Sequence, residues 1–168
     1  MKLRPVQPHD ALTLEAAFEA VGWSKPASLF ERYLREAAAG ERWTRVAVVD
    51  GEVAGYVTVV WESRDPGLAQ RGIPEVMDLN APPSHRRHGG GSALTDAAEG
   101  EVTRRGTPVG LRVGLHSGYG PAQRLYVGRG YRPDGLGARR RGEIVEEGAT
   151  VPLDDETTIT LIMDPTAT

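Results

Sequence analysis

The hydrophobic positions of the chain repeat with the period of a helix in some stretches and alternate like those of a strand in others. Residues 2–7 predict a short strand, and the helical repeat of residues 11–21 and 26–40 predicts two helices. Pro26 suits the first turn of the second helix, and Gly40 suits its end. We therefore expect the N-terminal part of the chain to be mainly helical.

Two runs rich in β-branched residues follow in residues 43–61, and they flank the pair Asp50-Gly51. An Asp-Gly pair between two such runs is a strong signal of a tight hairpin, so this stretch predicts two paired strands. The polar residues 63–72 predict a loop, and residues 73–81 predict a further strand that ends before Pro82.

A longer helix is predicted over residues 90–106, because Leu94, Ala98 and Val102 fall on one face and Gly106 suits its end. The later predicted elements are a strand at 108–116, a short helix at 120–130 and a strand at 157–163. Residues 135–143, rich in glycine and arginine, predict an exposed turn before the last strand.

The composition excludes several classes of protein. A chain of 168 residues is long enough to bury one core, so we expect a single domain, residues 1–168. There is no apolar run of the ~20 residues that cross a bilayer, no cysteine and no apolar segment after the first basic residues. A net charge of −3 argues against a nucleic-acid binder. We expect a cytoplasmic protein whose partners are small molecules, with no membrane and no nucleic acid among them.

The stretch SHRRHGGGSAL, residues 84–94, joins arginines and a histidine to three glycines directly before the predicted helix. Amide groups at the start of a helix are unpaired, and the positive end of the helix favours an anion that glycines allow to come close. The spacing Arg86-x-x-Gly89-x-Gly91 therefore predicts a pyrophosphate-binding loop. The alternative is a plain tight connection with solvated arginines. His85 and His88 have no third ligand at metal spacing, so we expect no metal.

Two motifs in this order resemble those of the GNAT superfamily of acyl-CoA-dependent N-acetyltransferases. The first is the strand followed by the arginine and glycine loop described above. The second resembles the short helix of the family and is carried by Ala122, Leu125, Tyr126, Gly130 and Tyr131. The resemblance covers residues 73–132. The chain departs from the family at residues 116–120, where many members have an asparagine.

The resemblance implies an α/β fold with a mixed, mostly antiparallel sheet that is splayed between the fourth and fifth strands and flanked by helices. It implies acetyl-CoA as co-substrate and no metal. The residues implied for the pyrophosphate are Arg86, Arg87, His88, Gly89, Gly90, Gly91 and Ser92. The pantetheine arm would pair with the end of the fourth strand at Leu79, Asn80 and Ala81, where a bulge would aim an amide at the thioester carbonyl.

The chemistry needs a group that takes a proton from the amine, because an ammonium has no lone pair with which to attack. Glu75 and Asp78 lie on the predicted strand and should point to opposite faces. We favour Glu75 as the base, with Asp78 or water as alternatives. Either carboxylate could instead form a strand-end ion pair with an arginine. Tyr126 matches the general acid of many family members, with packing beside the cofactor as its alternative role.

The predicted function is transfer of acetyl from acetyl-CoA to a primary amine of a small molecule, by direct attack in a ternary complex. The alternatives are a non-catalytic acyl-CoA-binding regulatory module and a protein or peptide N-acetyltransferase. The residues that fall where the family builds its acceptor pocket are Trp23, Phe30, Tyr33, Trp61 and Glu62, although we expect more than half of them in the core. A homodimer is left open.

Overall fold

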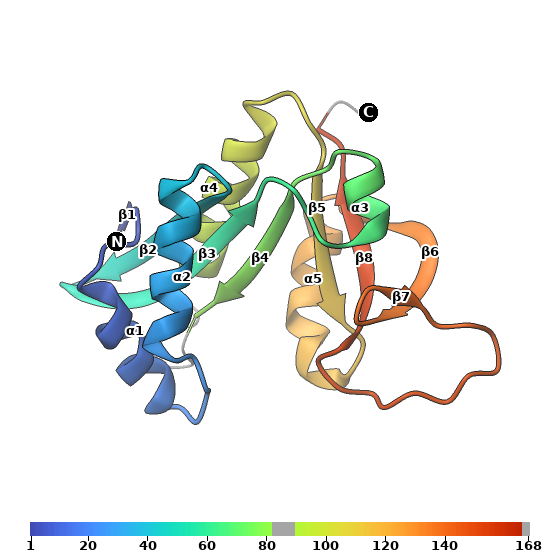
Figure 1. Cartoon of the computed structure of the whole chain (residues 1–168), viewed down its shortest axis with the longest axis horizontal. Helices are drawn as coiled ribbons and strands as arrows, with labels where there is room; N and C mark the ends of the chain where they lie inside the picture. The colour runs from blue at the N-terminus through green and yellow to red at the C-terminus, as the bar shows by residue number, and fades with distance from the viewer. Residues whose placement is uncertain (82–89, 166–168) are drawn as a thin grey trace. The chain divides into compact units, whose positions relative to one another are not determined.

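The computed structural model describes residues 1–81 and 90–165. The chain divides into two compact units. The first unit comprises Met1–Trp61 and Val76–Glu101, and the second comprises Glu62–Glu75 and Val102–Thr168. The α-helices and strands of both are labelled in Figure 1.

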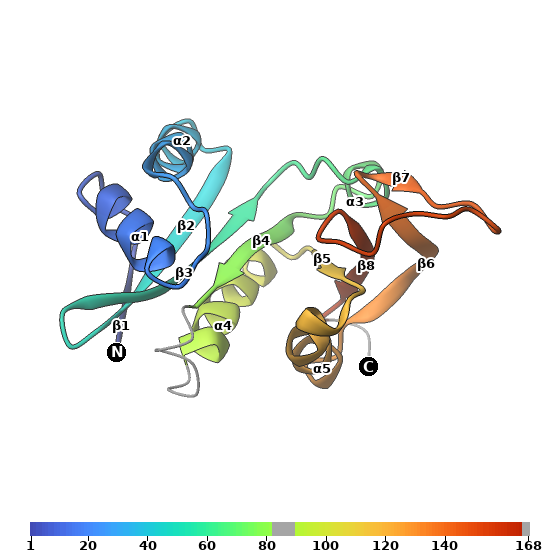
Figure 2. The same ribbon diagram turned by 90° about the horizontal axis from the view of Figure 1, so that it is seen from below.

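The first unit contains two helices near its N-terminus, four strands and most of a longer helix. They are β1 (Lys2–Arg4), α1 (Asp10–Glu19), α2 (Ala27–Ala38), β2 (Arg42–Val49), β3 (Glu52–Val60), β4 (Glu75–Asn80) and α4 (Gly90–Thr103). The strand order is β1-β2-β3-β4, and β2 runs antiparallel to both β1 and β3. In Figure 2, α1 and α2 cover one face of β2 and β3, and α4 lies on the other face.

The second unit consists of short helices and antiparallel strands. They are α3 (Pro66–Gln70), β5 (Val109–Gly114), the 3-10 helix η2 (Ser117–Tyr119), α5 (Gly120–Gly128), β6 (Arg132–Arg140), β7 (Glu143–Ile144) and β8 (Thr157–Met163). The strand order is β5-β8-β6-β7. The predicted α/β class, with a mixed and mostly antiparallel sheet and flanking helices, is confirmed. The predicted splay between the fourth and fifth strands and the single domain over residues 1–168 stay predictions.

The hairpin of β2 and β3 turns where the sequence predicts. Asp50 has φ 51° and Gly51 has φ 88°, so both residues lie in the left-handed region that a two-residue hairpin turn requires. The pairing shifts register between Ala47 and Val48, opposite the start of β3. Such a bulge bends the hairpin and increases its twist.

Aromatic side chains form the centre of the first unit. Tyr56 on β3 contacts the rings of Phe18 and Phe30 edge to face, with centroids 5.5 and 5.1 Å apart. Phe18 also stacks on Trp23, at 5.7 Å. These contacts pack α1 and α2 onto β3 in arrangements that aromatic pairs favour. Phe30 and Tyr33, expected either in the acceptor pocket or in the core, are buried in the core.

The prediction of a loop over residues 63–72 is wrong, because these residues contain α3. The carboxylate of Asp65 caps this helix by accepting a hydrogen bond from the Leu68 amide, at 3.0 Å. Leu68 is fully buried, and its side chain lies so close to Gly110 on β5 that a Cβ there would be 2.6 Å from a Leu68 methyl group. The absence of a side chain at Gly110 lets Leu68 pack against β5, and this contact stabilises a helix of five residues.

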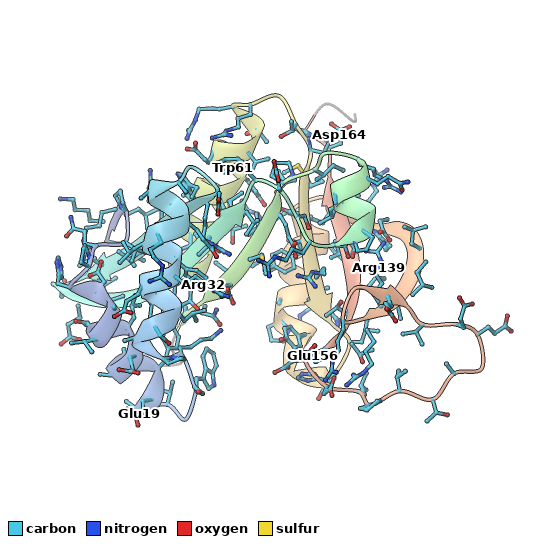
Figure 3. The ribbon with its side chains drawn as sticks, in the orientation of Figure 1. Glu19, Arg32, Trp61, Arg139, Glu156 and Asp164 are labelled. Carbon is cyan, nitrogen blue, oxygen red and sulfur yellow. The ribbon has the colours of Figure 1, made fainter. Side chains whose placement is uncertain are left out.

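The prediction of an exposed turn over residues 135–143 holds only in part. Residues 135–137, 141 and 143 are exposed, and a turn lies at 141–142, but β6 continues to Arg140. The Arg139 side chain, labelled in Figure 3, belongs to this strand and is only 2% exposed. Its guanidinium contacts Asp65 and Asp134, both at 2.5 Å, and also the Thr160 hydroxyl. A buried guanidinium needs such partners because an unpaired buried charge is very unfavourable.

None of the helices in residues 1–81 and 90–165 combines the length and the apolar composition of a membrane-spanning segment.

A side chain at Gly55 should destabilise the first unit. Gly55 lies on β3 with φ 151°, and a Cβ there would be 2.6 Å from the Asn80 carbonyl oxygen and 3.2 Å from the Ala81 Cα. Since backbone has to move, Gly55→Ala should lower the free energy of unfolding in urea by about 1–3 kcal/mol. Gly128→Ala is the control, because a Cβ there meets nothing within 4 Å. Equal stability of the Gly55 variant and the unchanged protein would contradict the prediction.

Candidate active site

Strand β4 contains a local distortion at Asp78. Its φ of 51° lies in the left-handed region, which a non-glycine residue within a strand rarely adopts. Such a conformation costs of order 1–3 kcal/mol and persists where surrounding contacts hold it. The family resemblance implies a bulge near Leu79, Asn80 and Ala81, and the distortion lies one residue before them. Binding of the cofactor by these three residues stays a prediction.

The Asp78 carboxylate has a partner on each oxygen. Oδ2 accepts a short hydrogen bond from the hydroxyl of Tyr33 on α2, and Oδ1 lies 3.4 Å from Nζ of Lys25. The side chains of Asp78 and Lys25 are 24% and 23% exposed, so solvent reaches the pair. All three residues belong to the first unit. The arrangement places an accessible carboxylate beside a primary amine.

Tyr33 acts as a permanent hydrogen-bond donor in this cluster. Burial raises the pKa of the Tyr33 phenol, and the neighbouring Asp78 carboxylate raises it further. The hydroxyl is therefore protonated at neutral pH and donates to Asp78. The guanidinium of Arg42 lies over the Tyr33 ring, 4.2 Å from its centroid, and contacts Glu36 at 2.5 Å.

The same arginine connects the cluster to the backbone of β4. Arg42 Nη1 donates to the Thr58 hydroxyl at 2.7 Å, and that hydroxyl donates to the Met77 carbonyl oxygen at 3.2 Å. Three residues after Met77, Asn80 Nδ2 lies 3.3 Å from the Tyr56 hydroxyl. The backbone of β4 before the distortion and the Asn80 side chain after it thus have polar contacts to β3.

Glu75, the favoured base in the sequence analysis, is 1% exposed. The Ser63 hydroxyl donates to its Oε2 at 2.6 Å, and Arg112 Nε lies 2.7 Å from its Oε1. The ion pair with an arginine, the alternative weighed for this residue, is therefore present. Both carboxylate oxygens already accept hydrogen bonds, and the side chain is almost closed to solvent. Its role as a base stays a prediction.

Tyr126 lies in the second unit on α5, which corresponds to the short helix predicted at residues 120–130. It is 7% exposed, and its ring contacts that of Tyr131 with centroids 5.5 Å apart. Gln123 of the same helix donates to the Gly114 carbonyl at the end of β5, at 2.7 Å. These contacts fix the helix to the strand. The general-acid role of Tyr126 stays a prediction.

The region that departs from the family pattern is organised around His116. Its Nδ1 accepts a hydrogen bond from the Gly118 amide at 3.1 Å, so in the neutral ring the proton resides on Nε2, which lies 2.9 Å from Asp155. His116 thereby caps η2. Both ring nitrogens are engaged in holding this turn.

Part of the predicted pyrophosphate loop lies outside the described residues, namely Arg86, Arg87, His88 and Gly89. The remaining residues, Gly90, Gly91 and Ser92, begin α4. A Cβ at Gly91 would meet no atom within 4 Å in the described part of the chain, and one at Gly90 would meet only the Met1 sulfur, at 3.9 Å. Packing in the described ranges therefore gives no reason for glycine at these positions.

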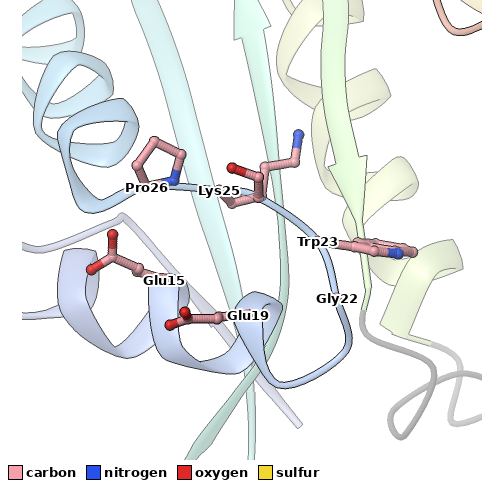
Figure 4. A pocket seen from close by; sticks show the side chains of 7 residues that line it. Glu15, Glu19, Gly22, Trp23, Lys25 and Pro26 are labelled. Atoms are coloured by element: carbon pink, nitrogen blue, oxygen red, sulfur yellow. The ribbon is translucent and has the colours of Figure 1, made fainter.

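A pocket of about 330 Å³ lies at the connection between α1 and α2 (Figure 4). Its lining residues are Glu15, Glu19, Gly22, Trp23, Ser24, Lys25 and Pro26. Glu15 Oε1 also accepts a hydrogen bond from the Ala27 amide at 3.0 Å. The pocket thus combines two carboxylates, an indole and an ammonium group.

Sequence reasoning missed Glu15, Glu19 and Lys25. The two glutamates are ordinary polar positions of an amphipathic helix, and no motif marks them. Lys25 carries one available signal, because lysine is rare in this chain. In residues 1–81 and 90–165 there is also no group of three His, Cys, Asp or Glu side chains that could hold a metal ion.

Solved structures share this fold over nearly the whole chain, at low sequence identity. A GNAT-family protein from Desulfovibrio desulfuricans is 19% identical, with a TM-score of 0.72 over 97% of this chain and 98% of that chain. Ribosomal-protein-alanine N-acetyltransferase from Brucella melitensis is 15% identical, with a TM-score of 0.71 over 98% and 99%. Arabidopsis thaliana NAA60 in complex with acetyl-CoA is 18% identical, with a TM-score of 0.69 over 99% of both chains.

Comparison by sequence gives two results. No curated protein sequence matches the chain. The model of the acetyltransferase (GNAT) family, in contrast, matches residues 10–131, which is well over half of the chain. The match includes both motifs on which the resemblance rests, and the chain therefore belongs to the GNAT family of acetyltransferases.

Proposed function

We propose that this protein transfers an acetyl group from acetyl-CoA to a primary amine of a small cationic molecule, by direct attack within a ternary complex. The observation that carries the proposal is the Asp78 carboxylate beside the pocket-lining Lys25, at a distortion of β4. A carboxylate in contact with a primary amine is the arrangement that proton removal from an acceptor amine needs. We further propose that residues 1–168 form one N-acetyltransferase domain.

Acetyl-CoA as co-substrate is supported by family membership and by the similar fold of NAA60, which was solved with acetyl-CoA. In this chain the start of α4 would bind the pyrophosphate through its free amides and its positive end. Gly90 and Gly91 support this role, because packing in the described ranges does not require them. The flanking Arg86 and Arg87 would add charge, and the end of β4 at Leu79–Ala81 would pair with the pantetheine arm.

For the base, the contacts favour Asp78 over Glu75. The Glu75 side chain is almost fully buried and engaged by Ser63 and Arg112, whereas about a quarter of the Asp78 side chain is exposed. Asp78 can exchange its Lys25 contact for a contact with a substrate amine while Tyr33 keeps the carboxylate in place.

Tyr126 is proposed to protonate the leaving thiolate, as in family members with this tyrosine. The chain has no cysteine to carry an acyl group, which favours direct attack.

The acceptor pocket is proposed to be the one between α1 and α2. Glu15 and Glu19 attract a cation, and the indole of Trp23 offers a face for cation–π contact. A small amine with a second positive charge fits these groups. The similarity to an enzyme named for ribosomal-protein alanine keeps a peptide acceptor as the alternative. The other alternative is an acyl-CoA-binding module without turnover.

A thiol-release assay with acetyl-CoA and a panel of amines tests the function. We expect release with diamines and polyamines, and a lower KM for these than for uncharged monoamines of equal length. Glu19→Gln should raise the KM for diamines several-fold and change that for monoamines little, because it removes one pocket charge. Release with peptide N-termini alone would establish the peptide alternative, and CoA binding without release would establish the non-catalytic one.

The proposed pyrophosphate site predicts that Gly91→Val weakens CoA binding. A Cβ at this position would meet no atom of the described residues within 4 Å, so the substitution should affect the ligand more than the fold. Isothermal titration should show Kd raised roughly tenfold or more, which is about 1.4 kcal/mol. Gly128→Ala is the control on a different helix. An unchanged Kd in the folded Gly91 variant would exclude the site.

The two candidate bases can be separated by single-turnover transfer to a competent amine. Asp78→Asn should slow transfer by about 10²–10⁴-fold at neutral pH. The loss should shrink as the pH approaches the pKa of the acceptor amine, because more of the amine is then neutral without a base. Glu75→Gln is the matched control and should affect unfolding by urea more than transfer. The same measurement on Tyr126→Phe reports on the acid. A full rate for Asp78→Asn, with slow transfer by Glu75→Gln, would reverse the assignment.

A further inference from the structure

We propose that Lys25 is a site of self-acetylation, which rests on the proposed function. In the absence of an acceptor, its ε-amine would take the acetyl group from the acetyl-CoA bound to the same molecule. The inference concerns the chain's own residue and not the acceptor, so the two can fail separately.

The position of Lys25 is the first argument. It lies in the connection between α1 and α2 and lines the pocket (Figure 4). Its Nζ is 3.4 Å from Asp78 Oδ1. Asp78 directly precedes Leu79–Ala81, the strand end proposed to pair with the pantetheine arm. The amine, the proposed base and the proposed thioester position thus fall within one unit of the structure. Lys25 occupies the contact that the acceptor amine would make.

The chemistry of the side chain is the second argument. A lysine ammonium is a primary alkylammonium, the same reacting group as in the proposed acceptors. Asp78 would take one proton from Nζ, and the nitrogen would attack the thioester carbonyl carbon. The carbon–sulfur bond breaks as the amide forms, the second proton is lost to solvent, and the CoA thiolate takes up a proton. The step balances as lysine ammonium plus acetyl-CoA giving acetyl-lysine, CoA and one proton.

The amino-acid usage of the chain is the third argument. Of its 20 basic residues only Lys2 and Lys25 are lysines, and the other 18 are arginines. A guanidinium stays protonated at all ordinary pH values and does not accept an acetyl group readily. One of the two ε-amines in the chain therefore lies against the proposed base. The other, Lys2, is exposed on β1.

Proximity sets the expected rate. Holding an amine next to its reaction partner replaces an encounter in solution by a unimolecular step, which strongly favours reaction when the geometry is suitable. Lys2 has no carboxylate partner among the described contacts and reports the background rate of chemical acetylation. Acetylation of Lys25 would also remove the positive charge from the pocket wall and end its ion pair with Asp78.

The test is incubation of the full chain with acetyl-CoA and no amine, followed by peptide mass spectrometry over time. We expect Lys25 to be acetylated at least about 10²-fold faster than Lys2, the size of effect that a positioned base gives. The rate constant should not depend on protein concentration, because each molecule modifies itself. Addition of a good acceptor amine should slow the labelling of Lys25 and leave that of Lys2 unchanged.

Two variants connect the labelling to the geometry. Asp78→Asn should slow acetylation at Lys25 towards the Lys2 rate, with Lys2 itself unaffected. Lys25→Arg keeps the positive charge and should show no acetyl group at position 25 while Lys2 still reacts at its background rate. A rate that rises in proportion to protein concentration would overturn the proposal, because one molecule would then be modifying another.

The remaining outcomes separate this inference from the proposed function. Equal slow labelling of Lys25 and Lys2, together with rapid acetylation of small amines, would overturn self-acetylation and leave the enzymatic function standing. Absence of labelling at Lys25 and of transfer to any amine or peptide would overturn both. Rapid labelling of Lys25 without transfer to any added amine would support self-acetylation and restrict the activity to the chain itself.

Discussion

The contact between Tyr33 and Asp78 is the constraint on which the first unit's polar cluster depends. It joins α2 to β4 at a residue whose backbone is in the left-handed region, a conformation that needs external contacts to persist. Burial and the neighbouring carboxylate raise the pKa of the Tyr33 phenol, so the donor is protonated at neutral pH. Arg42 then connects Tyr33 to Thr58 and to the β4 backbone. Tyr33 of α2 thus holds Oδ2 of the Asp78 carboxylate, while Oδ1 faces the Lys25 ammonium group, which an acceptor amine could replace.

The carboxylates of the second unit are arranged for a different purpose. Ser63 and Arg112 bind Glu75, and Arg139 binds Asp65. Both carboxylates are almost completely buried. Removing one partner from such a pair leaves a buried uncompensated charge, which is far more costly than losing a surface ion pair. We interpret these pairs as structural. Exposure and exchangeable partners, more than the identity of the residue, distinguish Asp78.

The hairpin and the main repeating elements could be predicted from the sequence because their signals are local. The turn at Asp50-Gly51 needs residues that adopt the left-handed conformation. In β4 and α4 the hydrophobic pattern repeats along the element itself. In contrast, α3 has five residues and forms because Leu68 packs at Gly110, a contact between segments about forty positions apart. The glycines and proline of β6 gave no strand signal, and its pairing with β8 supplies the stability that its composition lacks. Contacts between distant segments decided both cases.

The candidate site shows the same limit. The alternation of β4 predicts that Glu75 and Asp78 point to opposite faces, but spacing could not reveal that Tyr33, 45 positions away, approaches Asp78. Nor could it separate the polar positions of α1 that line a pocket from those that face solvent.

A transferase for cationic amines has to bind its acceptor as an ammonium ion and use it as a neutral amine. One carboxylate cannot serve both needs well, because strong pairing with the ammonium also stabilises its proton. The first unit offers two kinds of carboxylate: Glu15 and Glu19 at the pocket, and Asp78 with a hydrogen bond from Tyr33. In our proposal the glutamates attract the distal charge, and Asp78 receives the proton of the reacting nitrogen. Lys25 is then the cation that keeps Asp78 paired until an acceptor arrives, and its amine is the first that an acetyl group would meet in an empty pocket.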